Sequence, residues 1–378
     1  MQPSISRNAR IDFLRGIAIS CVLVLHFALA YGLKNSLLGD WINPALLRAI
    51  AFNGNFGVTI FFVISGYLIT SHSLTRWGEL EHIDARAFYL MRFARIMPSL
   101  LLALSIIVVL GCFDVAFFNN SDGGHHRPAS YFIVAAGSVL TFWHNLLMQS
   151  AGYFNYCLNV YWSLSVEEVF YLLLPLACLL LRRRSMIVAL CLAAIVAAPL
   201  YRAAHSSNEI FFMYGYLACF DAIAIGCLCA LLARRFTAGA RYRRGLRVLA
   251  LLALGAVYLR GIDGHEMFGF TLIAFTSAAF LLAASNDNSA GWSTRGWSSG
   301  LRWMGRHSYE IYLFHIIVLA LMRNVVVKTD LSYAARLPWL ALFLAATMLA
   351  AALVSRWVSE PANAAIRRRW GTIPVACK

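Results

Sequence analysis

The sequence has 378 residues, of which 61% are hydrophobic and only 13% are charged. This composition, with a mean hydropathy of +0.69, excludes a water-soluble globular protein and indicates an integral membrane protein. A net charge of +15 is typical of some nucleic-acid-binding proteins, but the basic residues fall between apolar runs, so we expect no nucleic-acid partner.

The first apolar run, residues 13–33, is too long for the apolar region of a signal peptide and lacks a small-residue cleavage site. We therefore expect it to remain as the first membrane span. Nine further runs have the length that crosses a bilayer. They lie near residues 53–71, 96–117, 163–181, 186–202, 211–233, 246–262, 267–285, 309–327 and 337–357.

An eleventh apolar run, residues 131–148, contains His144 and Asn145. If it crossed the membrane, the uncharged stretch 149–161 would be cytoplasmic and Arg182–Arg184 would be outside. With ten spans, 24 of the 32 Lys and Arg residues face the cytoplasm, in agreement with the positive-inside rule. The charge distribution therefore favours ten spans.

With ten spans both termini are cytoplasmic, residues 118–160 form a long extracytoplasmic loop with an apolar middle, and residues 359–378 form a short cytoplasmic tail. No linker divides the chain, and its halves lack the internal similarity that many secondary transporters show. The prediction is an all-α integral membrane protein: one transmembrane domain over residues 1–378, built as a bundle of about ten transmembrane helices.

The nine cysteines show no CxxC or Cys/His ligand spacing, so we expect packing residues and no metal site. A Cys112–Cys157 disulfide remains an alternative if both residues face an oxidising compartment.

Ionisable side chains at membrane depth are costly and usually functional. Arg15 and His26 belong to the first span, and the eleven residues between them place both within about 20° of one helix face, with His26 about 16 Å above Arg15. A histidine at that depth titrates near neutral pH, which indicates a general base. In the alternative interpretation, Arg15 is a snorkelling side chain and His26 is an interhelical hydrogen-bond partner.

The fourth span begins with Ser163, Glu167 and Glu168 close to the outer interface. Ser163 and Glu167 are four residues apart and share a face. A carboxylate there would orient a histidine and stabilise its protonated form. The two glutamates point about 100° apart, so we expect only Glu167 to face inward, while Glu168 hydrates the interface or contacts substrate.

Arg92 and Arg95, three residues apart before Pro98, form a basic pair on the cytoplasmic rim of the third span. Such arginines usually mark topology, but two on one face could also bind a phosphate-bearing ligand. In the ninth span Ser308, Tyr312 and His315 form a polar stripe, which core hydrogen bonding explains about as well as ligand contact does.

Six motifs occur in order along the chain. They are RIDFLRG (10–16) with His26, GVTIFFVISGYLI (57–69), RFARIMP (92–98), WSLSVEE (162–168), SYEIYLFH (308–315) and Glu360-Pro361. Together they resemble the acyltransferase 3 family of membrane O-acyltransferases.

The resemblance implies ten transmembrane helices with cytoplasmic ends, an acyl-CoA donor, usually acetyl-CoA, and a carbohydrate acceptor across the membrane. Arg15 and His26 match the family's essential arginine and histidine, and Arg92 and Arg95 match its paired arginines. Phe13 stands where the family often has glycine, and Val169 stands where it often has glutamine; neither departure removes a titratable group. Some members carry a fused esterase-like domain, which we do not expect in this chain, so it either acylates its acceptor directly or passes the acyl group to a partner.

The sequence therefore predicts a multi-pass O-acetyltransferase of the bacterial inner membrane, modifying a carbohydrate such as O-antigen or an exopolysaccharide. His26 would be the general base, supported by Glu167, or would carry the acyl group as an acyl-histidine. Acyl-CoA would bind to Arg15, Arg92, Arg95, Tyr312 and His315, and the acceptor to Ser163 and Glu168. The rival functions are a transporter or flippase of a glycan or acyl intermediate and a structural subunit of a polysaccharide assembly complex.

Overall fold

The computed structural model describes residues 8–370 except residues 35, 125, 286–295 and 297, so Arg7, Arg295, Cys377 and Lys378 lie outside the described residues. The described residues form helices, turns and loops without a strand. The α-helices are α1 (Ala9–Tyr31), α2 (Leu38–Trp41), α3 (Pro44–Phe52), α4 (Asn55–Trp77), α5 (Ala85–Cys112), α6 (Phe132–Leu140), α7 (His144–Ala151), α8 (Trp162–Leu181), α9 (Arg184–Ala204), α10 (Glu209–Tyr214), α11 (Tyr216–Ala233), α12 (Ala240–Arg260), α13 (Gly269–Ala284), α14 (Ser299–Arg306), α15 (Ser308–Val325), α16 (Arg336–Val354) and α17 (Glu360–Trp370). Short helical turns are η1 (Leu80–His82), η2 (Ala129–Tyr131), η3 (Asn159–Tyr161) and the π-helical turn η4 (Ser355–Ser359).

The predicted all-α membrane fold is confirmed. In the described part of the chain, eight helices are long and apolar enough to cross a bilayer, and they coincide with eight of the ten predicted spans. Large apolar side chains on these helices stay exposed, including Leu180 at 81% and Val196 at 63%, as expected for a surface covered by lipid. The protein is a multi-pass membrane protein.

The other two predicted spans correspond to α12 and α13, which pack against each other. Arginines at positions 241, 243, 244 and 247 make the first two turns of α12 strongly basic, and α13 has only 16 residues. The count of ten spans and the cytoplasmic location of both termini therefore stay predictions.

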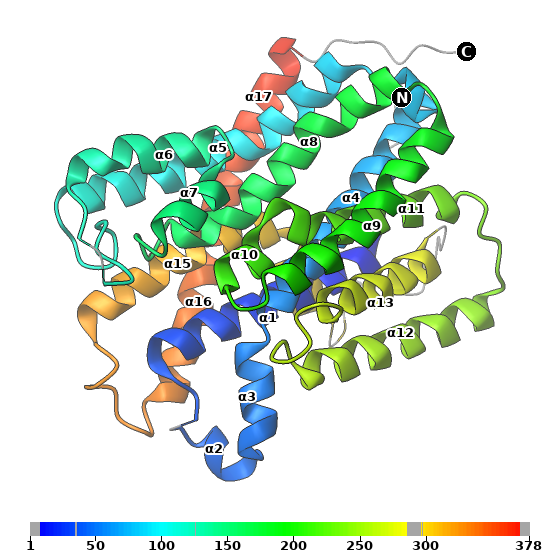
Figure 1. The fold of residues 1–378 in the computed structure, drawn as a ribbon. Coiled ribbons are helices and arrows are strands. Elements are labelled where there is room, and N and C mark those ends of the chain that lie inside the picture. Colours follow the sequence, from blue (N-terminus) through cyan, green and yellow to red (C-terminus); the bar gives the residue numbers. More distant parts are fainter. Residues whose placement is uncertain (1–7, 35, 125, 286–295, 297, 371–378) are drawn as a thin grey trace.

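The apolar run 131–148 is not one helix. It is divided into α6 and α7, and the chain turns between them at Phe142, which has a φ of 64°. Figure 1 shows α6 and α7 at one edge of the bundle, where α6 also contacts α5 and α8. Neither helix has the length needed to cross a bilayer, in agreement with the decision not to count this run as a span.

Glycines at two helix crossings allow helices to approach closely near the cavity described below. A Cβ added to Gly66 of α4 would lie 2.1 Å from the carbonyl oxygen of Ile223 in α11, and one added to Gly226 of α11 would lie 2.1 Å from that of Val63. At Gly305 of α14 an added Cβ would lie 1.8 Å from the carbonyl oxygen of Asp12 in α1. Only glycine permits these approaches, which fix α4 against α11 and α1 against α14.

The bundle has two distinct ends in Figure 1. Helices α2 and α3 lie at the bottom, and α17 rises at the top. The long helix formed by α16, η4 and α17 therefore runs through the molecule from one end to the other.

Candidate active site

A cavity of about 1580 Å³ lies inside the bundle. Its wall is formed by residues of α1, α4, α5, α8, α14 and α15, together with η4 and the start of α17. The volume exceeds the range of roughly 300–1,000 Å³ that accommodates most small ligands, so a large, extended ligand fits.

The three predicted phosphate-binding arginines all line this cavity. Arg15 donates from Nε and Nη2 to the hydroxyl of Ser308, at 3.1 and 2.8 Å. The guanidinium carbon of Arg92 lies 3.7 Å from the centre of the Tyr171 ring, and its Nε is buried without a hydrogen-bond partner. Arg95 lies one turn further along the same face of α5 as Arg92. The structure thus brings Arg15, Arg92 and Arg95 to one cavity.

Glu167 lies in the same cavity as the arginines. Its Oε1 accepts a hydrogen bond of 2.8 Å from Ser65 of α4, and its Oε2 accepts one of 3.3 Å from the hydroxyl of Tyr171. Tyr171 also lies beneath Arg92, so the carboxylate is connected to the paired arginines through this ring. In the described chain His26 makes no hydrogen bond or ring contact with Glu167; it contacts Val22 and His315 instead.

The expectation that only one of the two glutamates faces inward is wrong. Glu168 is 6% exposed, lines the cavity like Glu167, and has an Oε1 that is buried without a hydrogen-bond partner. The cavity extends around enough of α8 to reach both side chains, which are about 100° apart. Glu168 therefore does not hydrate an outer interface.

His26 and His315 form a pair of rings with centres 4.8 Å apart and planes at 64°. The Nδ1 of His26 lies 2.9 Å from the carbonyl oxygen of Val22, and the Nδ1 of His315 lies 2.6 Å from that of Tyr312. A carbonyl oxygen only accepts, so Nδ1 carries the proton in both rings and each Nε2 has a free lone pair. The Nε2 of His315 is buried and has no hydrogen-bond partner.

Tyr312 lies between the histidine pair and the cavity. Its hydroxyl is 2.6 Å from the Ser163 hydroxyl and 2.8 Å from the carbonyl oxygen of Val160, and its ring centre is 5.6 Å from that of His315. Tyr312 and Ser163 line the cavity, whereas neither histidine is part of the wall. The predicted ligand residue His315 thus lies behind Tyr312, against His26.

The sequence matches the family described as an acyltransferase domain over residues 8–356. The chain belongs to the acyltransferase 3 family. This match covers nearly the whole chain and confirms the predicted family.

Relatives of this chain carry names that refer to O-acetylation. The peptidoglycan O-acetyltransferase OatA of Listeria monocytogenes is 25% identical over 381 residues, covering 93% of this chain and 55% of that protein. The putative peptidoglycan O-acetyltransferase YrhL of Bacillus subtilis is 27% identical over 342 residues, covering 83% and 49%. The O-acetyltransferase OatA of Staphylococcus aureus is 30% identical over 178 residues, covering 46% and 25%. The acyltransferase chain spans about half the length, or less, of these curated relatives, and no solved structure matches it.

No role was assigned from the sequence to Ser65, which belongs to the motif at residues 57–69, or to Tyr171. In the structure both hydroxyls contact Glu167. The signal that could have found them is a hydroxyl-bearing residue in a long apolar span, which needs a polar partner in the bundle.

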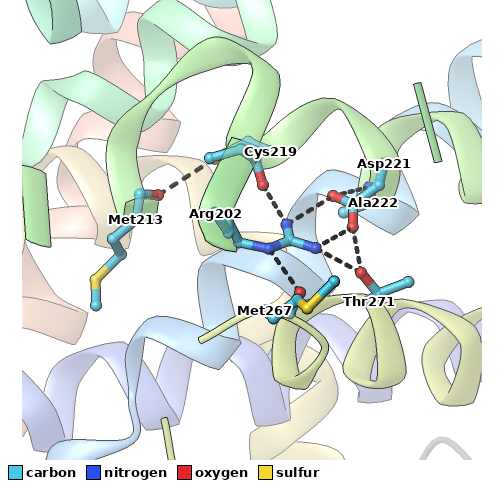
Figure 2. A network of polar contacts seen from close by, with 8 residues as sticks. Arg202, Met213, Cys219, Asp221, Ala222, Met267 and Thr271 are labelled. Atoms are coloured by element: carbon cyan, nitrogen blue, oxygen red, sulfur yellow. Dashed lines mark hydrogen bonds and ion pairs between the residues drawn. The ribbon is translucent and has the colours of Figure 1, made fainter. Parts of the chain in front are cut away.

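Sequence reasoning also missed an ion pair that links α9, α11 and α13. Arg202 Nη2 lies 2.8 Å from Asp221 Oδ2, and the two side chains are 0% and 1% exposed. Thr271 donates to the same carboxylate oxygen at 2.6 Å, and Arg202 also donates to the carbonyl oxygens of Met267 and Ala218 (Figure 2). Asp221, a lone acid in an apolar span, was the available signal.

The alternative of a Cys112–Cys157 disulfide is wrong. Both residues are free thiols: Cys112 is exposed at the end of α5, whereas Cys157 is buried with its sulfur directed at the carbonyl oxygen of Ile316 in α15. Among the described residues, no group of three or more His, Cys, Asp and Glu side chains is arranged to hold a metal ion.

Proposed function

We propose that this acyltransferase moves an acetyl group from acetyl-CoA, bound in the cavity, to a hydroxyl of an extracytoplasmic carbohydrate. The proposal is carried by one arrangement: a cavity lined by arginines ends at Tyr312, and a pair of histidines with free Nε2 atoms lies behind this tyrosine. The names of the relatives support acetyl as the group and carbohydrate as the acceptor class.

The cavity charges suit a polyanionic donor. Arg92 and Arg95 have no ion pair and donate no hydrogen bond within the described residues, although they lie on one face of α5 beside Arg15. Uncompensated guanidinium groups attract phosphate oxygens and can bind them bidentately. A CoA diphosphate held there would leave its pantetheine arm free to extend along α1, on which His26 lies about 16 Å beyond Arg15.

The tautomer of His26 supports Nε2 as the reacting atom. Nε2 accepts the proton of the acceptor hydroxyl, and the resulting oxygen attacks the thioester carbonyl carbon. The carbon–sulfur bond then breaks, and the thiolate leaves with the proton that the imidazolium returns, so the products are an O-acetyl ester and CoA. In the acyl-histidine variant the same Nε2 attacks the thioester first. His315 packs against the His26 ring, and we propose that it positions this ring rather than contacting the donor.

In this proposal Glu167 and Tyr312 do not react with the donor or the acceptor, but position the residues around them. Glu167 acts on His26 only at a distance, through the charge it places in the cavity and through Tyr171, which supports Arg92. Tyr312, held by Ser163, separates the cavity from the histidine pair, and in this proposal its ring moves aside when the thioester reaches Nε2 of His26. Ser163 and the unpartnered Glu168 remain the proposed contacts for the acceptor.

We further propose ten spans with cytoplasmic termini in a bacterial inner membrane, with O-antigen or an exopolysaccharide as the acceptor. A reporter fused after Asn120 or Asn155 should be extracytoplasmic, and one after Arg184 should be cytoplasmic. A cytoplasmic signal at Asn155 would contradict this topology. Mass spectrometry of surface glycans from a deletion strain would identify the acceptor. If only peptidoglycan lost O-acetyl groups, peptidoglycan would be the acceptor instead of O-antigen or an exopolysaccharide.

The test of the reaction uses purified protein, acetyl-CoA and an acceptor glycan. We expect acceptor-dependent release of free CoA, reduced by roughly 10²- to 10⁴-fold or more in His26→Ala. His205→Ala is the matched control, because His205 also hydrogen-bonds the carbonyl oxygen four residues earlier but packs against Tyr201 and Phe211 instead of His315. Retained activity in a folded His26→Ala protein would refute the base assignment, and glycan movement without CoA release would favour the transporter.

A further inference from the structure

A second basic cluster lies at the opposite end of the cavity from Tyr312. We call it the mouth cluster, formed by His72 and Arg76 of α4 and by Asn363 and Arg367 of α17. His72 and Arg76 are four residues apart, as are Asn363 and Arg367, so the two members of each pair lie on one face of their helix. All four residues line the cavity. Figure 1 shows α17 at the upper end of the bundle.

The two arginines of the mouth cluster lack acidic partners. Within the described chain neither Arg76 nor Arg367 has an ion pair or donates a hydrogen bond, and the guanidinium carbon of Arg76 lies 5.6 Å from the centre of the Trp77 ring. The two guanidinium groups line the same cavity and carry like charges, which repel each other. Glu360, the carboxylate on the same wall of α17, lies two turns from Arg367 and accepts a hydrogen bond from Ser355. An anion between the arginines would relieve this repulsion.

Within the mouth cluster, His72 lies within electrostatic range of Arg92 and Arg95, and Arg76 lies one turn further from Glu167 along α4. Ser65, which contacts Glu167, and Arg76 are eleven residues apart on α4, or about 16 Å along the helix. A ligand that extends from Glu167 to Arg76 along α4 therefore has room for anionic groups at two places.

We propose that the mouth cluster binds a phosphate monoester, namely the 3′-phosphate on the nucleotide of the acyl-CoA donor. This inference rests on the proposed function. Arg76 and Arg367 donate to the phosphate oxygens, and Asn363, whose Oδ1 is buried without a donor, accepts from a hydroxyl or amino group of the nucleotide. The group bound here does not change during transfer, so the cluster determines donor affinity and not the rate of the chemical step.

The test compares acetyl-CoA with acetyl-3′-dephospho-CoA, using full-length protein in phosphatidylcholine nanodiscs. We expect the KM for the dephospho donor to be higher by tenfold to a hundredfold, on the order of one lost charge-assisted contact, with kcat unchanged. Arg76→Gln and Arg367→Gln should raise the KM for acetyl-CoA and leave that for the dephospho donor unaltered. Arg367→Lys should recover part of the discrimination.

Arg368→Gln is the matched control, because Arg368 neighbours Arg367 on α17 but does not line the cavity and donates to the carbonyl oxygen of Ala364. Its kinetics should equal those of the wild type. Equal KM values for both donors in the wild type would overturn the mouth site while the proposed function stands. If neither donor is turned over, the proposed function fails, and calorimetric binding of adenosine 3′,5′-bisphosphate against 5′-AMP still tests the site.

A phosphate monoester also occurs on lipid headgroups. Nanodiscs containing phosphatidic acid distinguish the two sources: if Arg367→Gln alters kinetics only in those nanodiscs and the wild type does not discriminate between donors, the ligand is a lipid and the nucleotide assignment is refuted. We expect the same discrimination between donors in both lipid compositions.

Discussion

Two groups of charged side chains lie inside this bundle, and they differ in how completely the protein pairs them. In the Arg202–Asp221 network, the carboxylate, the guanidinium and the Thr271 hydroxyl all bond one another (Figure 2). In the cavity, Arg92 Nε and Glu168 Oε1 are buried without partners. Buried polar groups normally have hydrogen-bond partners. We therefore expect the fully paired Arg202–Asp221 network to hold helices together, and the unpaired groups of the cavity to face a ligand.

The largest effect is expected on the free energy of unfolding, when the Arg202–Asp221 network is broken. Asp221→Ala leaves Arg202 buried and uncompensated, and should lower the free energy of unfolding by about 3–5 kcal/mol. Removing both charges with Arg202→Leu and Asp221→Leu should recover much of that loss, because no unpaired charge remains. Thermal unfolding in detergent micelles measures both variants.

Asp263→Ala is the control for that prediction. Asp263 also pairs with an arginine, Arg48, at 3.5 Å, but its side chain is 95% exposed. Water screens such a pair, so its removal should not measurably change the unfolding midpoint. If Asp221→Ala were as stable as Asp263→Ala, the complete hydrogen bonding of the Arg202–Asp221 network would not indicate a structural role.

A smaller effect is expected from Glu167→Gln, now on activity. The amide still accepts from Ser65 but removes the negative charge, which should lower kcat roughly tenfold, the difference between a charged and a neutral hydrogen bond. The unfolding temperature should stay close to that of the wild type. Glu266→Gln is the control, because Glu266 lies outside the cavity. A collapse of stability with unchanged kcat would move Glu167 into the structural group.

The smallest effect is expected from Arg95→Lys, which keeps the charge and loses the planar fork. If Arg95 holds a phosphate, the KM for acetyl-CoA should rise by a few-fold, with kcat and stability unchanged. Arg86→Lys, on the same helix but outside the cavity wall, should behave as the wild type. An unchanged KM with a collapsed kcat would instead assign Arg95 to the reaction centre or to folding.

Much of the fold was predictable because hydropathy and charge asymmetry act segment by segment. Eight of the ten predicted spans coincide with apolar helices long enough to cross a bilayer. Of the proposed site, the arginines at positions 15, 92 and 95 and the carboxylate of Glu167 do line one cavity. The partners of Glu167 and the inward direction of Glu168 were not predicted, because spacing along one helix gives only relative directions, not which neighbouring helix lies there.

The sequence by itself determined the membrane bundle, the family, and which ionisable residues share a helix face, because composition, motif order and a rotation of about 100° per residue are local properties. Only the tertiary structure decided the partners. His26 meets His315, Glu167 of α8 meets Ser65 of α4, and Arg76 faces α17 across the cavity mouth. These meetings depend on how closely helices cross, as at Gly66 and Gly305, where one added methyl group would collide with backbone. No periodicity within a single helix encodes that distance.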